Sequence, residues 1–315
     1  MDFTSVELCA GAGGQALGLE QAGFEHVALV EYDAWASSTL RLNRPQWNVV
    51  EDDLNEWDGA RYKGVDLVAG GVPCPPFSVA GKQLGASDER DLFPAALRLV
   101  EQIQPKAVMF ENVRGLMTPK FDDYRQRIND RLSSLGYTPR WRLLNACHYG
   151  VSQLRPRAVM VALDSEFATN FEWPEPHQSP PRHVGDLLVD LMSSNGWEHA
   201  DQWAKRANRI APTLVGGSKK HGGPDLGPSR ARKAWAELGV DGRLIGNNPP
   251  HPGFQGMPHL TTRMAARIQG FPDDWEFAGA KTNAYRQIGN AFPPPVARAV
   301  GRQIARALSR SSVDV

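Results

Sequence analysis

A cysteine flanked by prolines is the first candidate for chemistry in this 315-residue sequence. Cys74 stands in Pro73-Cys74-Pro75-Pro76, directly after a short apolar run. Prolines remove backbone freedom and fix the direction of the side chain between them, which a merely structural thiol does not need. We therefore predict that Cys74 is a nucleophile, and that the polar, glycine-bearing stretch 79–90 is a lid over the site.

An acid and two arginines follow in an order that suits a polar ring. Glu111, in Phe110-Glu111-Asn112-Val113, ends another apolar run. Ligands of open α/β sheets bind at the carboxyl ends of the strands. Arg155 and Arg157, in Gln-Leu-Arg-Pro-Arg, lie on the same side of the chain if that segment is extended. On one sheet edge, these residues supply a nucleophile, an acid and an anchor.

A glycine turn near the N-terminus predicts a nucleotide-type cofactor. Gly11-Ala12-Gly13-Gly14-Gln15-Ala16 fits G-x-G-x-x-A, and Glu31 follows Gly11 by twenty residues. Glycines let the backbone approach a ligand, and an acid at that distance can accept both ribose hydroxyls. Taken alone, the pattern fits a dinucleotide or S-adenosyl-L-methionine equally well.

The elements that must position these residues alternate between strand and helix. We expect strands at 3–9, 27–31, 65–69, 107–111, 140–146 and 158–163, and helices at 15–22, 33–43, 92–103 and 124–135. This alternation predicts an α/β fold with a doubly wound, mostly parallel sheet. From about 164 to 258 the chain is rich in Pro, Gly, Ser, Asn and Trp, which indicates a second, loop-rich domain or a large insertion. Helices are expected again at 259–269 and 295–308, the latter returning to close the first domain.

The charge is balanced in sum and uneven along the chain. There are 35 basic and 35 acidic residues, so the formal net charge is zero. Residues 1–60 hold eleven acids and two bases, a net −9, whereas 201–235 hold eight bases and two acids, a net +6. A polyanionic partner is therefore expected at one face only.

Composition excludes several classes of protein. No run of 18 apolar residues and no signal peptide is present, so we expect a cytoplasmic protein without a membrane span. Cys9, Cys74 and Cys147 are far apart and lack metal-ligand spacing, so neither a disulfide framework nor a metal site is expected.

Taken together, the sequence resembles the DNA (cytosine-5) methyltransferase family of bacterial stand-alone type, over nearly the whole chain. The shared blocks, in the family's order, are LCAGAGG, PCPPFS, ENV, QLRPR and the segments 262–272 and 285–291. Pro75 departs from the usual Gln, Cys9 from a common aromatic, and 88–93 is one residue short. The resemblance implies a Rossmann-like methyltransferase fold. It assigns 1–165, completed by 280–315, to an S-adenosyl-L-methionine-binding catalytic domain, and 166–279 to a smaller, irregular target-recognition domain.

The resemblance also implies roles for the reactive residues. Cys74 would attack carbon 6 of a cytosine flipped out of the duplex, which activates carbon 5 for methylation. Glu111 would bind the ring's N3 and amino group and protonate N3. Arg157 would hold O2, and Arg155 would lie on a phosphate or in the same network.

The cofactor and DNA contacts follow from the same resemblance. Gly11, Gly13 and Gly14 would approach the methionine part and Glu31 the ribose. Tyr32 would pack on adenine, and Asp53, or alternatively Asp52, would meet its amino group. The other cofactor contacts would be Cys9, Ala10, Leu54, Pro73, Leu92, Asn290 and Ala291. The expected DNA contacts are Ser78, Gln83, Thr213, Lys219, Lys220, Arg230, Arg232 and Lys233.

The expected partners are double-stranded DNA and a cognate restriction endonuclease. The enzyme itself is expected to be a monomer that releases S-adenosyl-L-homocysteine. Three alternatives stay open. One is an RNA cytosine-5 methyltransferase on the same frame, and another is a catalytically silent DNA-binding relative. A nicotinamide dehydrogenase is supported only by the glycine turn and Glu31.

Overall fold

The computed structural model describes residues 3–73, 91–217 and 223–310. The predicted nucleophile Cys74, the lid 79–90 with Ser78 and Gln83, and the lysines Lys219 and Lys220 lie outside these ranges. Their roles therefore remain predictions.

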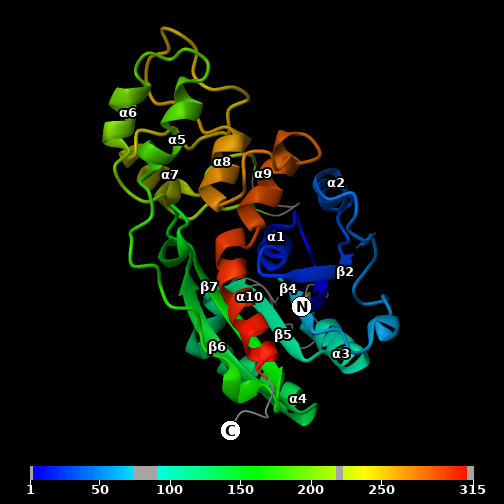
Figure 1. Cartoon of the computed structure of the whole chain (residues 1–315). Helices are drawn as coiled ribbons and strands as arrows, with labels where there is room; N and C mark the ends of the chain where they lie inside the picture. The colour runs from blue at the N-terminus through cyan, green and yellow to red at the C-terminus, as the bar shows by residue number, and fades with distance from the viewer. Residues whose placement is uncertain (1–2, 74–90, 218–222, 311–315) are drawn as a thin grey trace.

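A seven-stranded sheet in the order β3-β2-β1-β4-β5-β7-β6 forms the centre of the molecule (Figure 1). The strands are β1 (Phe3–Leu8), β2 (Phe24–Val30), β3 (Val49–Val50), β4 (Leu67–Gly70), β5 (Ala107–Val113), β6 (Tyr137–Asn145) and β7 (Pro156–Asp164). The first five strands are parallel, and β7 is antiparallel to both β5 and β6. The predicted doubly wound, mostly parallel sheet is confirmed.

The sheet lies between two hydrophobic cores. Successive residues along each strand point into the two cores in turn. In β5, Val108 and Phe110 belong to one core, whereas Ala107 and Met109 belong to the other. Because both faces are buried, these strands read as continuous apolar runs in the sequence. Helices α3 (Phe93–Ile103) and α4 (Asp122–Ser134) cover the first face.

The opposite face carries α10 (Pro294–Ser309), which lies beside α1 (Gly14–Glu20) (Figure 1). Gly18 permits this close approach, since an added Cβ would lie 2.3 Å from the backbone oxygen of Pro294. The prediction that the C-terminal helix returns to the first domain is confirmed. Helix α2 (Ala34–Asn43) follows β2, and its first turn is capped by the Asp33 side chain, which accepts from the backbone N–H groups of Trp35 and Ala36.

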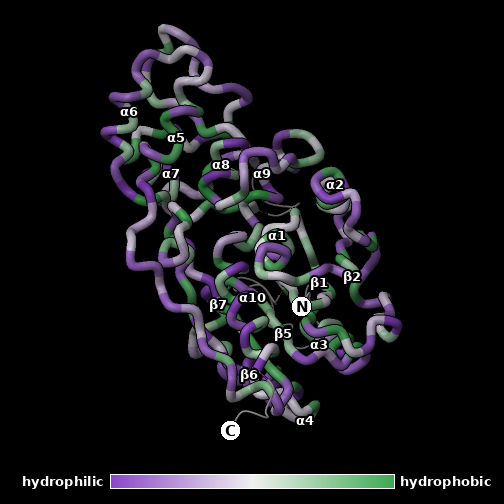
Figure 2. The backbone as a smooth tube through the Cα atoms, viewed as in Figure 1, coloured by the Kyte–Doolittle hydropathy of each residue, from purple (hydrophilic) through white to green (hydrophobic). Residues whose placement is uncertain are grey.

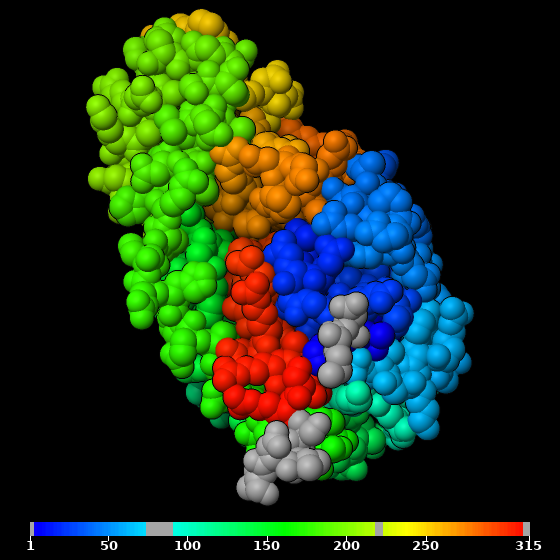
Figure 3. Space-filling view, viewed as in Figure 1, coloured from blue at the N-terminus to red at the C-terminus, as the bar shows by residue number. Residues whose placement is uncertain are grey.

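The region from 166 to 279 is more regular than the sequence indicated. It contains α5 (Val184–Ser193), α6 (Ala200–Arg206), α7 (Ser229–Glu237) and α8 (Thr262–Gln269), and α9 (Lys281–Asn290) follows. Three of these helices, α5, α6 and α7, lie within the part 164–258 that was expected to be loop-rich. Residues of this region form a lobe at the top of the view in Figure 3, and the α5 tube carries both hydrophobic and hydrophilic residues (Figure 2). Short 3-10 turns occur at Ala60–Tyr62, Arg114–Met117, Pro119–Phe121, Ala146–Tyr149 and Ala168–Asn170.

The chain after α8 turns back onto the first helices. The indole nitrogen of Trp275 donates to the backbone oxygen of Ala12 at 3.2 Å, and Asn43 exchanges hydrogen bonds with the backbone of Glu276. The lobe is thereby joined to the sheet domain through one continuous core. The expected boundary at 279/280 stays a prediction. Within the described ranges, no helix is long and apolar enough to cross a membrane.

Candidate active site

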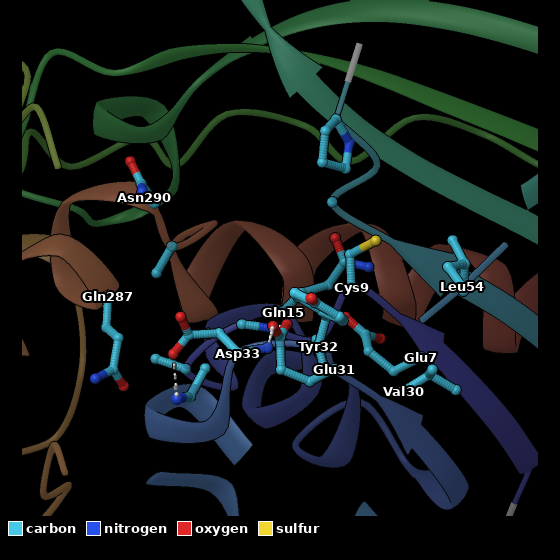
Figure 4. Close-up of a pocket in the computed structure, with 18 of the residues that line it drawn as sticks. Glu7, Cys9, Gln15, Val30, Glu31, Tyr32, Asp33, Leu54, Gln287 and Asn290 are labelled. Carbon is cyan, nitrogen blue, oxygen red and sulfur yellow. Dashed lines mark hydrogen bonds between the residues drawn. The ribbon is translucent and has the colours of Figure 1, made fainter. Parts of the chain in front are cut away.

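A cavity of about 650 Å³ opens at the carboxyl ends of β1, β2, β4 and β5. The strand order reverses between β1 and β4, which is where open α/β sheets bind ligands. Figure 4 shows Gln287 and Asn290 of the α9 segment on one side of the cavity, and Cys9 and Leu54 on the other. Its volume is that of a small-molecule site.

The glycine turn and the acid after β2 are bonded to each other. Glu31 accepts from the backbone N–H of Gly11 through Oε2 and from that of Asp33 through Oε1, both at 2.7 Å. Gly11 has a φ of +56°, in the left-handed region that favours glycine. Burial raises the pKa of Glu31, and the two backbone bonds oppose that rise. Each carboxylate oxygen keeps a lone pair for a ligand hydroxyl.

The rim of the cavity carries an aromatic ring and two acids. Tyr32 is 71% exposed although it lines the cavity, so one ring face is open to a planar ligand. Asp53 accepts from the backbone and side-chain nitrogens of Asn55 at 2.9 and 3.0 Å. Asp52 lines the same wall, so the choice between the two acids stays open.

Most of the predicted cofactor residues line this cavity, and Gly13 does not. Gly13 instead lets α1 pack closely, since an added Cβ would lie 2.8 Å from the Leu40 side chain and 2.9 Å from the Trp275 ring. Its φ of +82° also favours glycine. The lining residues that were expected are Cys9, Ala10, Gly11, Gly14, Glu31, Tyr32, Asp53, Leu54, Pro73, Leu92, Asn290 and Ala291.

Sequence reasoning missed two buried polar residues of the cavity, Glu7 and Gln15. The side-chain oxygen and nitrogen atoms of both are buried without a hydrogen-bond partner among the described residues. Gln15 lies beside Glu7, but burial dominates and raises the pKa of Glu7 to about 8. Such orphan groups fit a cavity that receives a polar ligand with both donors and acceptors. The sequence signal that could have identified Glu7 is its position as an acid inside the apolar run Val6-Glu7-Leu8.

The predicted catalytic acid is paired with the predicted anchor. The Nε of Arg157 lies 2.8 Å from Oε1 of Glu111, and both side chains are nearly buried. Burial raises the pKa of the Glu111 carboxyl, whereas Arg157 and Arg155 lower it. An ideal Cβ on Gly71 would lie 3.3 Å from Glu111 Oε2, so the acid stands beside the chain that leads to Cys74.

Arg155 does not lie where a phosphate could reach it. Its side chain is fully buried and donates to the backbone oxygens of Leu214, Gly289 and Ala291 at 2.7–3.0 Å. The two arginines, which flank Pro156, therefore have different partners: backbone oxygens for Arg155 and Glu111 for Arg157. This burial does not fit a phosphate contact at Arg155, and its hydrogen-bond partners differ from those of Arg157, so a role for Arg155 at the ring stays a prediction.

The two cysteines that the structure describes are poor nucleophiles. Burial raises the pKa of the Cys9 thiol, and the nearby acids Glu31, Glu7 and Asp53 raise it further. Burial also raises the pKa of Cys147. A thiol that stays protonated is unreactive, which leaves Cys74 as the candidate.

The expected DNA contacts that can be placed lie in the lobe. Arg230 and Lys233 are exposed on α7, and Arg232 is half-buried there. Thr213 is half-buried, and its hydroxyl donates to the backbone oxygen of Leu154 beside the two arginines. Across the part of the chain that the structure describes, no group of three His, Cys, Asp or Glu residues could hold a metal ion.

A glycine turn, a ribose-type acid and a cavity at the switch point of a parallel sheet define a nucleoside-cofactor-binding α/β protein. The family model for C-5 cytosine-specific DNA methylases matches residues 3–306, and the chain belongs to that family. It is a DNA cytosine-5 methyltransferase that uses S-adenosyl-L-methionine.

Similar proteins extend over the whole chain. Type II methyltransferase M.NgoMIV of Neisseria gonorrhoeae is 57% identical over 99% of this chain and 100% of its own length. Type II methyltransferase M.NaeI of Lentzea aerocolonigenes is also 57% identical, over 96% of this chain and 75% of its own length. The fold is shared with the crystal structure of a prophage-encoded putative DNA modification methyltransferase from E. coli. That structure has a TM-score of 0.70 at 24% identity and covers 98% of this chain and 100% of its own.

Proposed function

We propose that the protein methylates carbon 5 of a flipped-out cytosine in a specific duplex sequence, through a covalent Cys74 adduct, as the modification enzyme of a restriction–modification pair. The buried Glu111–Arg157 pair beside the chain leading to Cys74 is the observation that carries this proposal. The naming of the two 57% identical relatives as Type II methyltransferases supports the restriction–modification role.

Glu111 and Cys74 act together on the ring. The Cys74 thiolate forms a bond to carbon 6, and the electron pair displaced from the 5,6 double bond is stabilised as Glu111 protonates N3. Burial raises the pKa of Glu111, which favours its part as a proton donor. After carbon 5 has taken the methyl group, N3 returns its proton to Glu111, and loss of the carbon 5 proton to solvent re-forms the 5,6 double bond and expels the thiolate.

Arg157 has two tasks in this arrangement. Its Nε fixes Oε1 of Glu111, which leaves Oε2 free to face the base. Its two terminal nitrogens present donors in a rigid fork, and Nη1 also donates to the backbone oxygen of Pro156. The remaining donors suit the O2 atom of the ring.

The cavity would hold the methyl donor, which supplies an electrophilic methyl group. Glu31 would accept from the ribose, Tyr32 would cover the adenine, and Asp53 or Asp52 would meet the adenine amino group. Glu7 and Gln15 supply buried polar atoms beneath the loop of Cys9. DNA would lie across the lobe that carries Arg230 and Lys233, with the target base turned into the site at a cost of roughly a few kcal/mol.

The proposal is tested by incubating the enzyme with labelled S-adenosyl-L-methionine and mixed-sequence duplex DNA. The wild type should label the DNA, and Cys74→Ser should not. DNA with 5-fluorocytosine at the target should trap a denaturation-resistant adduct, because fluorine cannot leave as the proton does.

Two results would contradict the assignment. An adduct that persists in Cys74→Ala would exclude Cys74 as the nucleophile. Label that enters RNA but never duplex DNA, with normal cofactor binding, would favour the RNA methyltransferase.

A further inference from the structure

The segment 214–217 of the recognition lobe supports the wall of the cofactor cavity from behind. A Cβ added to Gly289 would lie 2.5 Å from the backbone nitrogen of Gly216, and one added to Gly216 would lie 2.5 Å from Oδ1 of Asn290. Asn290 also donates to the backbone oxygen of Gly217 at 3.3 Å. The lobe's backbone therefore touches the α9 end whose Asn290 and Ala291 line the cavity.

Arg155 ties the same two segments together from within. One terminal nitrogen donates to the backbone oxygen of Leu214 at 2.8 Å. The other donates to Gly289 at 2.7 Å and to Ala291 at 3.0 Å. Only a forked guanidinium can serve carbonyls on both sides at once. The Arg155 side chain is 0% exposed, so water does not compete for these bonds.

Two buried amides complete the link. Gln153 accepts from the backbone N–H of Leu214 at 2.9 Å and donates to the side-chain oxygen of Gln269 at 2.7 Å. Gln269 in turn donates to the backbone oxygen of Ala291. With Arg155, these amides form a closed circuit between the lobe and α9, which we call the buried clamp.

We propose that Arg155 is a positioning residue that makes the recognition segment 214–217 part of the cofactor site, so that cofactor and DNA affinities are coupled. The DNA half rests on the proposed function. A ligand on Asn290 and Ala291 stabilises the arrangement that DNA needs at the segment, and linkage makes the effect reciprocal.

The first measurement is the affinity for S-adenosyl-L-homocysteine without DNA, by calorimetry on the full chain. Arg155→Lys should weaken it by about tenfold or more, because one ammonium cannot reach the carbonyls on both sides. Arg140→Lys is the matched control, since Arg140 also donates to a backbone oxygen, that of Phe171, away from the cavity. Gly216→Ala should weaken the affinity as well, whereas its neighbour Val215→Ala should not.

The second measurement is the ratio of DNA affinities with and without saturating S-adenosyl-L-homocysteine. We expect at least about a fivefold gain in the wild type and less than about twofold in Arg155→Lys. A merely structural arginine would lower stability and leave this ratio unchanged.

The outcomes separate the two proposals. A folded Arg155→Lys with wild-type cofactor affinity and an unchanged ratio would overturn the clamp. If Arg155→Lys does not fold, Gly216→Ala decides, and normal cofactor affinity there overturns it. Failure of every variant and the wild type to bind DNA contradicts the proposed function, while the cofactor measurement still decides the clamp.

Discussion

At the scale of single residues, the surroundings of three buried carboxyl groups decide what the site can do. Glu31 has backbone donors, Glu111 has an arginine, and Glu7 has only the neighbouring Gln15 side chain. The same side-chain type therefore meets three environments within one cavity. Only the partnered acids were identified from the sequence, because spacing and motif reveal a position but not its burial.

Glu7 predicts a pH-dependent stability. Its pKa is raised from 4.5 to about 8, so the folded state holds a proton that the unfolded state loses between these values. The free energy of unfolding should fall as pH rises through that window. Relative to Glu7→Gln, the wild type should lose on the order of 2–3 kcal/mol between about pH 6 and about pH 8.5, measured by urea denaturation.

The exposed Glu25, on β2, provides the control for this experiment. Glu25→Gln should follow the wild-type curve at both pH values. Parallel curves for Glu7→Gln and the wild type would show that Glu7 is ionised in the folded protein.

At the scale of elements, the α1–α10 contact is a close helix packing that depends on a glycine. A Cβ at Gly18 would lie 2.3 Å from Pro294 O and 2.6 Å from the Ala297 Cβ. Gly18→Ala should therefore destabilise the protein by about 1–3 kcal/mol, since overpacking forces backbone shifts.

Gly223→Ala is the comparison, because the nearest atom to its added Cβ among the described residues is 3.8 Å away. Its unfolding free energy should stay within about 0.5 kcal/mol of the wild type. Equal stability of the two variants would mean that α10 can shift without cost.

Strong sequence patterns predicted most elements of the sheet domain. Elements with weak patterns were not predicted, for physical reasons. Strands such as β5 were visible as apolar runs, and the glycine turn fixed the start of α1. The two-residue β3 is too short to leave a pattern, and α7 buries fully only Trp235 among its nine residues. The antiparallel insertion of β7 is a long-range pairing that local sequence does not encode. The cavity was predicted mainly through motifs, Asn290 of α9 included, whereas Glu7, Gln15 and the other α9 residues that line it needed the fold.

The whole molecule separates its charges although the sum is zero. Residues 1–60, with a net −9, supply most of the acids that line the cavity, and the lobe contains the described parts of 201–235, a segment with a net +6 in the sequence. Arg230→Ala with Lys233→Ala on α7 should weaken DNA binding. It should also reduce the slope of log affinity against log salt by up to about 1.8, or about 0.9 per lost phosphate contact.

A charge-matched pair tests whether position matters. Arg302→Ala with Arg306→Ala removes the same charge from exposed positions of α10, and the slope should change little. If both pairs reduce the slope equally, attraction comes from overall charge and the α7 face has no special part.

The pairing of α1 with α10 also orders events during synthesis. Residues 14–20 leave the ribosome early, but the helix that covers them is made almost 280 residues later. Until then the apolar side of α1 has no permanent cover, and the α9 end of the cavity does not exist. The nascent chain therefore completes its cofactor site only after α10 has been made, and until then partly made protein is exposed to aggregation and proteolysis at α1.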